Sequence, residues 1–325
     1  MKVFSFGCRP YDEVELFERF SREMGINLGC TKQSLREDSL HLAMGADYVS
    51  VLTEGVDAQM LSGLKEMGVK MLGTRTVGYD HIDCAHAKKI GLKVSNSAYS
   101  PDAVAEYTIM LMLMALRNAK RIIQRAAIND FTLKGLSGNN LSDRTVGIVG
   151  LGSIGLRVAE LLKGFGCEVY GCDSKGRSFD GITVLPINEL FEKCDVISLH
   201  APSRESTRHM INKDTLALMP KGTVIVNTAR GELIDTAALV DALADGHIAA
   251  CGLDVVEGER ELYYYNKKSA VLNEPYMALL RDMPNAILTP HMAFYTHKSV
   301  EDMVRNCLKA FVLEEKGESN PFRIV

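Results

Sequence analysis

The sequence predicts an α/β protein made of two doubly wound domains, each with a parallel sheet. Short apolar runs alternate with helical patterns over the first hundred residues, and the same alternation resumes at Thr145. The length of 325 residues is sufficient for two domains with separate cores. Since 46% of the residues are apolar and 24% are charged, the composition is that of a globular chain and not of a disordered one.

The first alternating stretch is followed by a long helical pattern. Strands are expected at 2–7, 46–52, 69–74 and 92–98, and helices at 11–24, 57–67 and 81–90. At Ser100 a Ser-Pro-Asp start opens a helical pattern of about 27 residues that is apolar on one side. We expect one continuous helix there, which would suit a bridge or an interface.

The second alternating stretch also predicts a doubly wound unit. Its expected strands fall at 145–150, 168–173, 195–200, 222–229, 248–255 and 286–290, and its expected helices at 153–165, 187–194, 212–219 and 235–245. One more helix is expected at 297–317. The stretch 256–284 has no regular pattern and is long for a loop in a compact domain, so it is a candidate lid.

Charge and cysteine content exclude several classes of function. A formal net charge of −4 offers no basic surface to nucleic acid or to an anionic membrane. The most apolar segment, 109–116, is far shorter than the roughly 20 residues of a membrane-spanning helix, so we expect a buried helix and no membrane partner. The eight cysteines include no CxxC pair and no metal-ligand spacing, which predicts a reducing cytoplasm and no metal site.

The segment VGIVGLGSIG (146–155) predicts a dinucleotide site. Gly150, Gly152 and Gly155 form a G-x-G-x-x-G turn between an apolar strand and a helix, and the next strand ends in Asp173. In such a turn the glycines allow close approach of the pyrophosphate, and the acid accepts hydrogen bonds from the ribose and repels a 2′-phosphate. NAD is therefore favoured over NADP, with a reservation for the nearby Lys175 and Arg177. The competing interpretation is a purely structural strand–turn–helix.

Polar residues end four strands of the second stretch. His200, Arg230, Asp254 and His291 each follow an apolar run, and the carboxyl ends of parallel strands meet at one edge of a sheet. We therefore expect these four side chains to lie near the glycine-rich turn. Of the four, His200 is interpreted as structural.

Three acidic residues follow the strand that ends in Asp254. Glu257, Glu259 and Glu261 form a cluster that could simply be solvated. Periodicity does not distinguish among the three.

Taken together, the motifs resemble the D-isomer-specific 2-hydroxyacid dehydrogenases, in particular the D-lactate dehydrogenase branch with its vancomycin-resistance pyruvate reductases and aryl-lactate dehydrogenases. The resemblance covers essentially the whole chain. Its pieces are TRTVGYDHID (74–83), AYSPDAVAEYT (98–108), VGIVGLGSIG, SLHAP (198–202), NTARGELID (227–235), GLDVVEGE (252–259) and TPHMAFYT (289–296).

The resemblance implies a particular domain arrangement. A Rossmann NAD-binding domain, 100–294, would be inserted into a flavodoxin-like substrate domain formed by 1–99 and 295–325. The inserted domain would begin with a linker helix, and a homodimer would form through the region 101–127. The active site would lie in the cleft between the domains, a frequent location for small-molecule sites.

The resemblance also assigns catalytic roles. Arg230 would bind the substrate carboxylate and polarise the keto group, for which a planar guanidinium is well suited. His291 would be the general acid. The acid that pairs with this histidine falls five residues after the Asp of LDVxEGE, which selects Glu259 over Glu257.

Further positions match cofactor and substrate contacts of the family. The implied NAD contacts are Gly150, Gly152, Ser153, Ile154, Gly155, Asp173, Ala201, Pro202, Thr207, Thr228, Ala229, Arg230 and Asp254. The implied substrate contacts are Leu52, Val77, Gly78, Tyr99, Arg230 and Phe294, with Val77 and Gly78 acting through their backbone.

The implied reaction is the reduction of a 2-keto acid to a D-2-hydroxy acid by NADH, and its reverse. Pyruvate, giving D-lactate, is the expected substrate. Leu52 stands where some D-lactate enzymes have an aromatic residue, and Phe294 where several relatives have tyrosine. A larger pocket would favour phenylpyruvate or 4-methyl-2-oxopentanoate instead. An alternative of another class is a non-catalytic NAD-sensing protein like the corepressors that share this fold.

Overall fold

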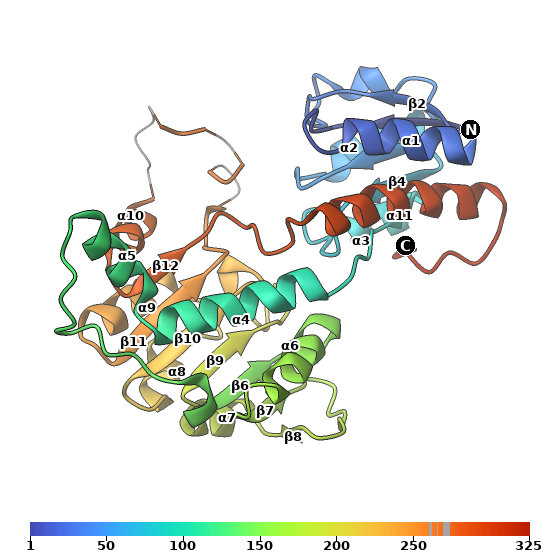
Figure 1. Cartoon of the computed structure of the whole chain (residues 1–325). Helices are drawn as coiled ribbons and strands as arrows, with labels where there is room; N and C mark the ends of the chain where they lie inside the picture. The colour runs from blue at the N-terminus through green and yellow to red at the C-terminus, as the bar shows by residue number, and fades with distance from the viewer. Residues whose placement is uncertain (260–261, 265, 269–273) are drawn as a thin grey trace. The chain divides into compact units, whose positions relative to one another are not determined.

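The computed structural model describes residues 1–259, 262–264, 266–268 and 274–325. The chain forms two compact units (Figure 1). Unit 1 comprises Met1–Ser100 and Tyr295–Val325, and unit 2 comprises Pro101–Phe294. The C-terminal segment therefore belongs to the same unit as the N-terminal hundred residues.

Unit 1 contains a five-stranded parallel sheet in the order β2-β1-β3-β4-β5. Its strands are β1 (Lys2–Ser5), β2 (Asn27–Cys30), β3 (Tyr48–Val51), β4 (Met71–Thr74) and β5 (Lys93–Ser95). Its helices are α1 (Val14–Met24), α2 (Ala58–Glu66), α3 (Cys84–Ile90) and α11 (His297–Glu315), with a 3-10 turn at η1 (Leu40–Ala43).

Alternating side chains of the central strands fill two cores in unit 1. Tyr48 and Met71 are buried in a core with residues of α1 and α11, whereas Val49 and Leu72 are buried in a core with residues of α2 and α3. This follows from the two-residue period of a strand, which sends neighbouring side chains to opposite faces. Helix α11 thus packs on one face of a sheet whose first strand begins almost 300 residues earlier in the sequence.

Unit 2 contains a seven-stranded parallel sheet in the order β12-β11-β10-β9-β6-β7-β8. Its strands are β6 (Thr145–Val149), β7 (Glu168–Cys172), β8 (Thr183–Val184), β9 (Val196–Leu199), β10 (Thr223–Asn227), β11 (Ile248–Leu253) and β12 (Ala286–Leu288). Its helices are α4 (Asp102–Leu116), α5 (Ala119–Ala127), α6 (Ser153–Lys163), α7 (Ile187–Lys193), α8 (Lys213–Leu218), α9 (Thr236–Ala244) and α10 (Pro275–Asp282); short 3-10 turns lie at η2 (Leu141–Asp143) and η3 (Gly231–Leu233).

Two layers of helices cover this second sheet. Helices α4 and α6 pack on one face, and α7, α8, α9 and α10 contribute to the core on the other face. The central strands β9 and β10 are buried on both faces, which explains why they appear in the sequence as continuous apolar runs and not as alternating ones.

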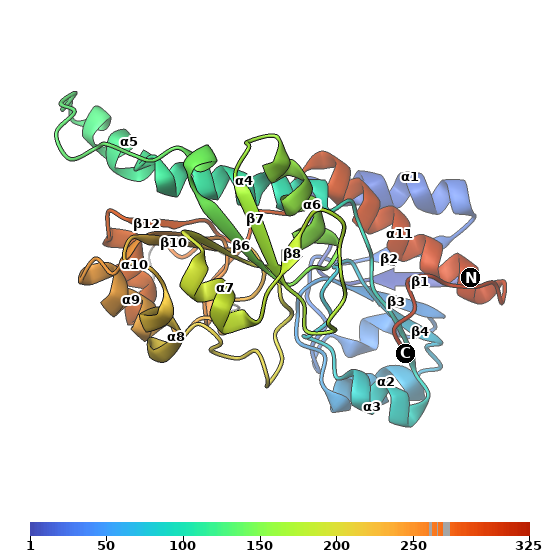
Figure 2. The ribbon, with the colours of Figure 1, turned by 90° about the horizontal axis from the view of Figure 1, so that it is seen from below.

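The prediction of a single long helix from Ser100 is wrong. The structure has two helices, α4 and α5, separated at Asn118, whose φ of 53° is left-handed. Asparagine tolerates this conformation, which cannot continue a right-handed helix. Helix α4 is largely buried, whereas α5 contains no buried residue and extends past the sheet of unit 2 (Figure 2).

Strands β2 and β8, helix α10 and the short 3-10 turns were not expected from the sequence. Strands β2 and β8 are only partly buried and contain few apolar residues. Helix α10 lies within the stretch 256–284, for which no regular structure was expected. Among the helices that the structure describes, none is long and apolar enough to cross a membrane.

Candidate active site

The glycine-rich turn joins β6 to α6 in unit 2. Gly150 has a φ of +100°, and a Cβ there would lie 2.7 Å from the carbonyl oxygen of His200. A Cβ on Gly155 would lie 2.0 Å from the carbonyl oxygen of Gly150, so the backbone of the helix packs directly against the backbone of the turn. Gly152, in contrast, faces open space, and no side chain caps the N-terminus of α6. The turn therefore leaves room and backbone N–H groups for a pyrophosphate.

Asp173 directly follows β7, the strand that pairs with β6. Its Oδ1 accepts a hydrogen bond from Lys175 N at 2.7 Å, and its Oδ2 accepts one from Arg177 Nη2 at 2.6 Å. The hydrogen bond from Arg177 holds the pKa of Asp173 below its ordinary value. The predicted ribose acceptor is thus a charged carboxylate beside the glycine-rich turn.

The remaining expected cofactor positions lie at the ends of β9 and β10 or at the start of α6. Thr207 donates from Oγ1 to Pro202 O at 2.8 Å and closes the loop that follows β9. Thr228 shares a hydrogen bond of 2.8 Å with Thr108 on α4. Both hydroxyls are therefore used in holding loops of unit 2. The others in this group are Ser153 and Ile154 in α6, Ala201 after β9 and Ala229 after β10.

Arg230 lies in a turn that Asn227 shapes from the last position of β10. Asn227 accepts a hydrogen bond from Ala229 N at 3.0 Å and donates from Nδ2 to Arg230 O at 2.8 Å. A Cβ on Gly231 would lie 2.1 Å from the carbonyl carbon of Val256. The turn that carries Arg230 is therefore packed against the segment that leads to Glu259.

The backbone of His291 is held by the buried Asp254. The carboxylate of Asp254 accepts hydrogen bonds from Thr289 Oγ1 at 2.6 Å and from the N–H groups of Met292 and Ala293, each at 2.8 Å. Its carbonyl oxygen accepts His291 N at 2.7 Å. Burial raises the pKa of Asp254, although these hydrogen bonds act in the opposite direction. His291 itself has a φ of 53°, a conformation that costs about 1–3 kcal/mol and persists only where the surroundings enforce it.

The structure pairs His291 with Glu259 and not with Glu257. His291 Nδ1 lies 2.6 Å from Glu259 Oε1, and the other oxygen of Glu259 accepts Val256 N at 2.7 Å. Because a charged carboxylate can only accept hydrogen bonds, the proton of this contact belongs to Nδ1, and Nε2 is the nitrogen left for proton transfer. Glu257 instead contacts Arg208 at 2.9 Å. Glu261, the third acid of the cluster, lies outside the described residues.

Two aromatic rings flank His291. The ring of Phe294 lies edge-on to the imidazole, with centroids 6.4 Å apart. The ring of Tyr264 lies 6.2 Å away, and its hydroxyl donates to His291 O at 2.9 Å. Tyr264 comes from the stretch 256–284, so part of this stretch approaches the histidine, although eight of its residues are not described.

The expected substrate contacts of unit 1 lie on loops at the carboxyl ends of its strands. Thr76 Oγ1 donates to Gly78 O at 2.6 Å, Asn96 Nδ2 donates to Val77 O at 2.8 Å, and Ser97 N donates to Thr76 O at 2.9 Å. These bonds use three successive carbonyl groups within the unit. The orientation of the peptide groups at Val77 and Gly78 is thereby fixed.

Leu52 is held in a similar way after β3. Its N–H donates to Glu54 Oε2 at 2.9 Å, and its carbonyl accepts Thr74 Oγ1 at 2.8 Å. The Leu52 side chain is half-buried, as is Tyr99 near the end of the N-terminal segment of unit 1.

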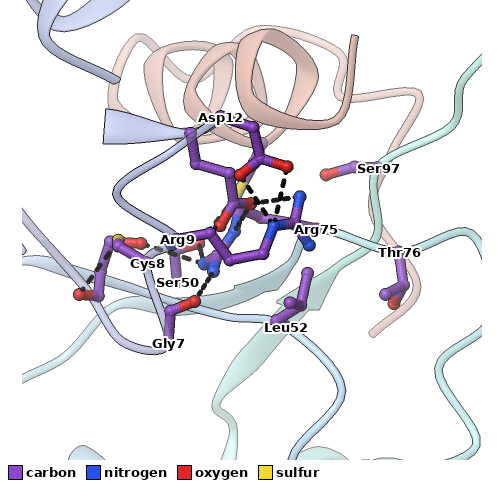
Figure 3. Close-up of polar contacts among 12 residues, drawn as sticks. Gly7, Cys8, Arg9, Asp12, Ser50, Leu52, Arg75, Thr76 and Ser97 are labelled. Carbon is purple, nitrogen blue, oxygen red and sulfur yellow. Dashed lines mark hydrogen bonds and ion pairs between the residues drawn. The ribbon is translucent and has the colours of Figure 1, made fainter. Parts of the chain in front are cut away.

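The buried Arg75 contacts groups of unit 1 (Figure 3). Its Nε contacts Glu13 Oε1 at 2.9 Å, and both side chains are 0% exposed. Its Nη1 donates to the hydroxyls of Ser5 at 3.0 Å and Ser50 at 2.8 Å, and Nη2 donates to two backbone carbonyls. All donors of a buried guanidinium are thus satisfied, which links β1, β3 and β4 at the edge where the loops begin.

His200 is held inside unit 2, in agreement with the structural interpretation. Its Nε2 shares a hydrogen bond of 2.8 Å with Ser198 Oγ. Burial lowers the pKa of His200 to about 4, so the ring is neutral at ordinary pH.

Several residues that shape the site were not singled out in the sequence. Asn227 and Arg75 are polar residues next to buried strands, the same signal that pointed to Arg230 and His291. Thr289 precedes the Pro-His pair and carries no distinguishing pattern. Tyr264 lies in the irregular stretch and could not be found from periodicity. Among the described residues, no group of His, Cys, Asp and Glu could hold a metal ion.

An open glycine cradle at the end of the first strand of a seven-stranded parallel sheet is the arrangement of a dinucleotide-binding protein. Residues 109–293 match the NAD-binding domain of the D-isomer specific 2-hydroxyacid dehydrogenases. The chain belongs to this family. It is an NAD-dependent dehydrogenase with a Rossmann domain, and the predictions of family, fold class and cofactor are confirmed.

Relatives align over nearly the whole chain. A D-specific alpha-keto acid dehydrogenase from Enterococcus faecium is 39% identical over 94% of this chain and 94% of its own. An aromatic 2-oxoacid reductase from Clostridium sporogenes is 37% identical over 94% of this chain and 93% of its own. A solved structure of D-2-hydroxyisocaproate dehydrogenase is 34% identical, with a TM-score of 0.90 and coverage of 100% of this chain and 99% of its own.

Proposed function

We propose that the protein reduces pyruvate to D-lactate with NADH, and that His291, Glu259 and Arg230 carry the reaction. The observation that supports this most directly is the contact of 2.6 Å between His291 Nδ1 and Glu259 Oε1 in unit 2. Bound NADH supplies the hydride that is added to C2 of the keto acid. The residues of the chain supply the proton and bind the carboxylate.

The proton goes to the carbonyl oxygen of the substrate. Glu259, fixed by Val256 N, holds Nδ1 of His291 and thereby orients the imidazole ring. Nε2 then donates its proton as the C2–O double bond becomes a C–O single bond. In lactate oxidation the same nitrogen accepts the hydroxyl proton.

Arg230 binds the carboxylate of the substrate in this proposal and polarises its keto group. Two parallel N–H donors of a guanidinium match a carboxylate, which a lysine cannot reproduce. The backbone N–H groups of Val77 and Gly78 are assigned to the same carboxylate on the basis of the family resemblance. Their fixed orientation within unit 1 supports this assignment.

The cofactor is assigned to the glycine-rich turn, with its pyrophosphate at Gly152, Ser153 and Ile154. Asp173 is the ribose acceptor, and the loops after β9 and β10 complete the site. Asp254 was expected to contact NAD, but its side chain is 0% exposed and binds the loop 289–293. We therefore assign to Asp254 the positioning of His291.

A second candidate substrate is a bulkier 2-keto acid such as phenylpyruvate or 4-methyl-2-oxopentanoate. Leu52 supports it, because a leucine leaves more room than an aromatic ring. The relatives that are named for aromatic 2-oxoacids and for 2-hydroxyisocaproate support it as well. Tyr99 and Phe294 are assigned to the wall of the same pocket.

Assembly as a cytoplasmic homodimer is also part of the proposal. Helix α5 and the segment after it expose Ile123, Ile128, Phe131 and Leu133, four apolar side chains that a second copy of the chain would cover. All eight cysteines are free thiols, as expected in a reducing compartment. The mass of the protein in solution, measured by light scattering, tests the dimer. A monomer at micromolar concentration would refute it.

The test of function is the oxidation of NADH with pyruvate, phenylpyruvate and 4-methyl-2-oxopentanoate, each compared by kcat/KM. We expect turnover with pyruvate and formation of D-lactate only. A higher kcat/KM for one of the larger acids would replace pyruvate by the second candidate. NADH binding without turnover of any 2-keto acid would contradict the enzymatic role and favour a sensor.

A further inference from the structure

The loop after β7 places a cation against the acid of the cofactor site. Arg177 donates to Asp173 Oδ2 twice, from Nη2 at 2.6 Å and from Nε at 3.1 Å. The other oxygen, Oδ1, accepts Lys175 N at 2.7 Å. Both oxygens of the predicted ribose acceptor are therefore bonded to groups of its own loop.

Arg177 also contacts the glycine-rich turn. Its Nη2 donates to Leu151 O at 3.1 Å, and Leu151 lies between the first two glycines of the turn. The guanidinium carbon is 5.1 Å from the centre of the Phe179 ring. Arg177 thus bridges the end of β7 and the turn, the two elements that hold the ribose and the phosphates of a bound dinucleotide.

The two partners of this ion pair differ in exposure. The side chain of Asp173 is 4% exposed, whereas that of Arg177 is 48% exposed. The carboxylate is therefore fixed, while the guanidinium can leave it for another anion without unpacking the core. Between 173 and 177 the loop contains one acidic residue and two basic ones, Lys175 and Arg177.

We propose that Arg177 determines the relative affinity of this site for NADH and NADPH. It competes with the adenosine ribose for Asp173, and it binds the 2′-phosphate of NADPH. The enzyme then binds NADPH as well as NADH.

The physical reason is the charge at the place where the two cofactors differ. A lone carboxylate there accepts the ribose hydroxyls of NADH and repels the 2′-phosphate of NADPH. Arg177 neutralises that repulsion and offers paired N–H donors, which bind phosphate oxygens well. The same contact lowers the affinity for NADH, whose ribose must displace Arg177 from Asp173.

The test compares two ligands that lack the nicotinamide, so its result does not depend on the proposed keto acid. 5′-AMP and 2′,5′-ADP differ only in the 2′-phosphate, and their binding to the full-length protein is measured by titration calorimetry. For wild type we expect affinities within about tenfold of each other, since one charge-assisted contact offsets one repulsion.

The Arg177→Gln variant should bind 2′,5′-ADP about tenfold or more weakly, because it loses the charge-assisted contact. Its affinity for 5′-AMP should stay the same or rise by about threefold, since Asp173 no longer has a competing donor. The Asp173→Asn variant should gain about tenfold for 2′,5′-ADP, and the added Arg177→Gln change should remove this gain. Turnover with NADPH should follow the same order.

Lys175→Gln is the matched control, because it removes a positive charge from the same loop without removing the ion pair. At physiological salt it should change the affinity for 2′,5′-ADP by less than about threefold, since exposed charges are screened. Equal weakening of both ligands by Arg177→Gln, or an equal effect of Lys175→Gln on 2′,5′-ADP, would overturn the proposal. Absence of 5′-AMP binding to wild type would overturn it together with the cofactor site.

Discussion

The pair Glu13–Arg75 in unit 1 and the pair Glu259–His291 in unit 2 differ in burial. Glu13 and Arg75 in unit 1 are both 0% exposed. Glu259 and His291 in unit 2 are 15% and 28% exposed. The first pair is surrounded by further donors and acceptors of its own unit, whereas the second leaves one imidazole nitrogen for a reactant.

The difference shows how similar charge pairs acquire different roles. A fully buried pair with every donor satisfied can only maintain the fold, since no ligand reaches it. A half-buried pair keeps its geometry and can still exchange a proton. We therefore expect changes at Glu13 or Arg75 to alter stability, and changes at Glu259 or His291 to alter the reaction.

The largest expected effect concerns the reaction. Arg230→Lys should lower kcat/KM for every 2-keto acid by about a thousandfold, because an ammonium group cannot make the two parallel bonds of a guanidinium. Arg208→Lys is the matched control, since Arg208 is exposed and contacts Glu257 outside the proposed machinery. Steady-state kinetics measures both. Activity of Arg230→Lys close to that of the control would refute the carboxylate role.

The next effect concerns the stability of unit 1. Glu13→Gln should lower the free energy of unfolding by about 3 kcal/mol, because it leaves the buried guanidinium of Arg75 without its counter-ion. Lys298→Gln removes the exposed partner of the pair with Asp302 and should cost less than about 1 kcal/mol. Urea unfolding measures both. Equal values for the two variants would remove the distinction between buried and exposed pairs.

The sequence predicted the sheets because their strands are apolar runs separated by helical patterns. It missed β2 and β8, which are short, lie at sheet edges and are only partly buried, so their residues carry no apolar run. It joined α4 and α5 into one helix because only the backbone of Asn118 interrupts the pattern. A single left-handed residue leaves no trace in periodicity.

The candidate site was predictable where function requires an unusual residue next to a buried strand. Arg230, Asp254 and His291 stood out for this reason. The choice of Glu259 came from the resemblance, because all three acids of its cluster fit the same pattern. The roles of Asn227, Thr289 and Asp254 in holding the loops depend on contacts that form only in the folded chain, and no local sequence pattern encodes these contacts.

A smaller effect concerns the neutral histidine of unit 2. The pKa of His200 is lowered to about 4 by burial, whereas the unfolded chain has the ordinary value near 6.5. The stabilisation is therefore present above about pH 6.5 and is lost as the pH falls toward 4. Wild type should lose about 1–2 kcal/mol more than His200→Gln between pH 7 and pH 5. Identical losses in urea unfolding would show that His200 titrates normally in the folded state.

The smallest effect concerns substrate specificity. It would show that Leu52 of unit 1 contacts the side chain of the substrate. Leu52→Tyr should raise the preference for pyruvate over 4-methyl-2-oxopentanoate about tenfold, because a larger ring reduces the room for the longer chain. The ratio of the two kcat/KM values measures it. An unchanged ratio would place Leu52 outside the substrate pocket.

The most direct test of the catalytic pair is kcat/KM for pyruvate reduction by wild type, Glu259→Gln and Glu257→Gln. Glu259 holds the His291 ring through Nδ1, so Glu259→Gln should lower kcat/KM by about a hundredfold. Glu257→Gln should keep the wild-type kcat/KM, since Glu257 contacts Arg208 and not His291. A kcat/KM of Glu259→Gln that equals that of Glu257→Gln would contradict the assignment of the acid–base pair.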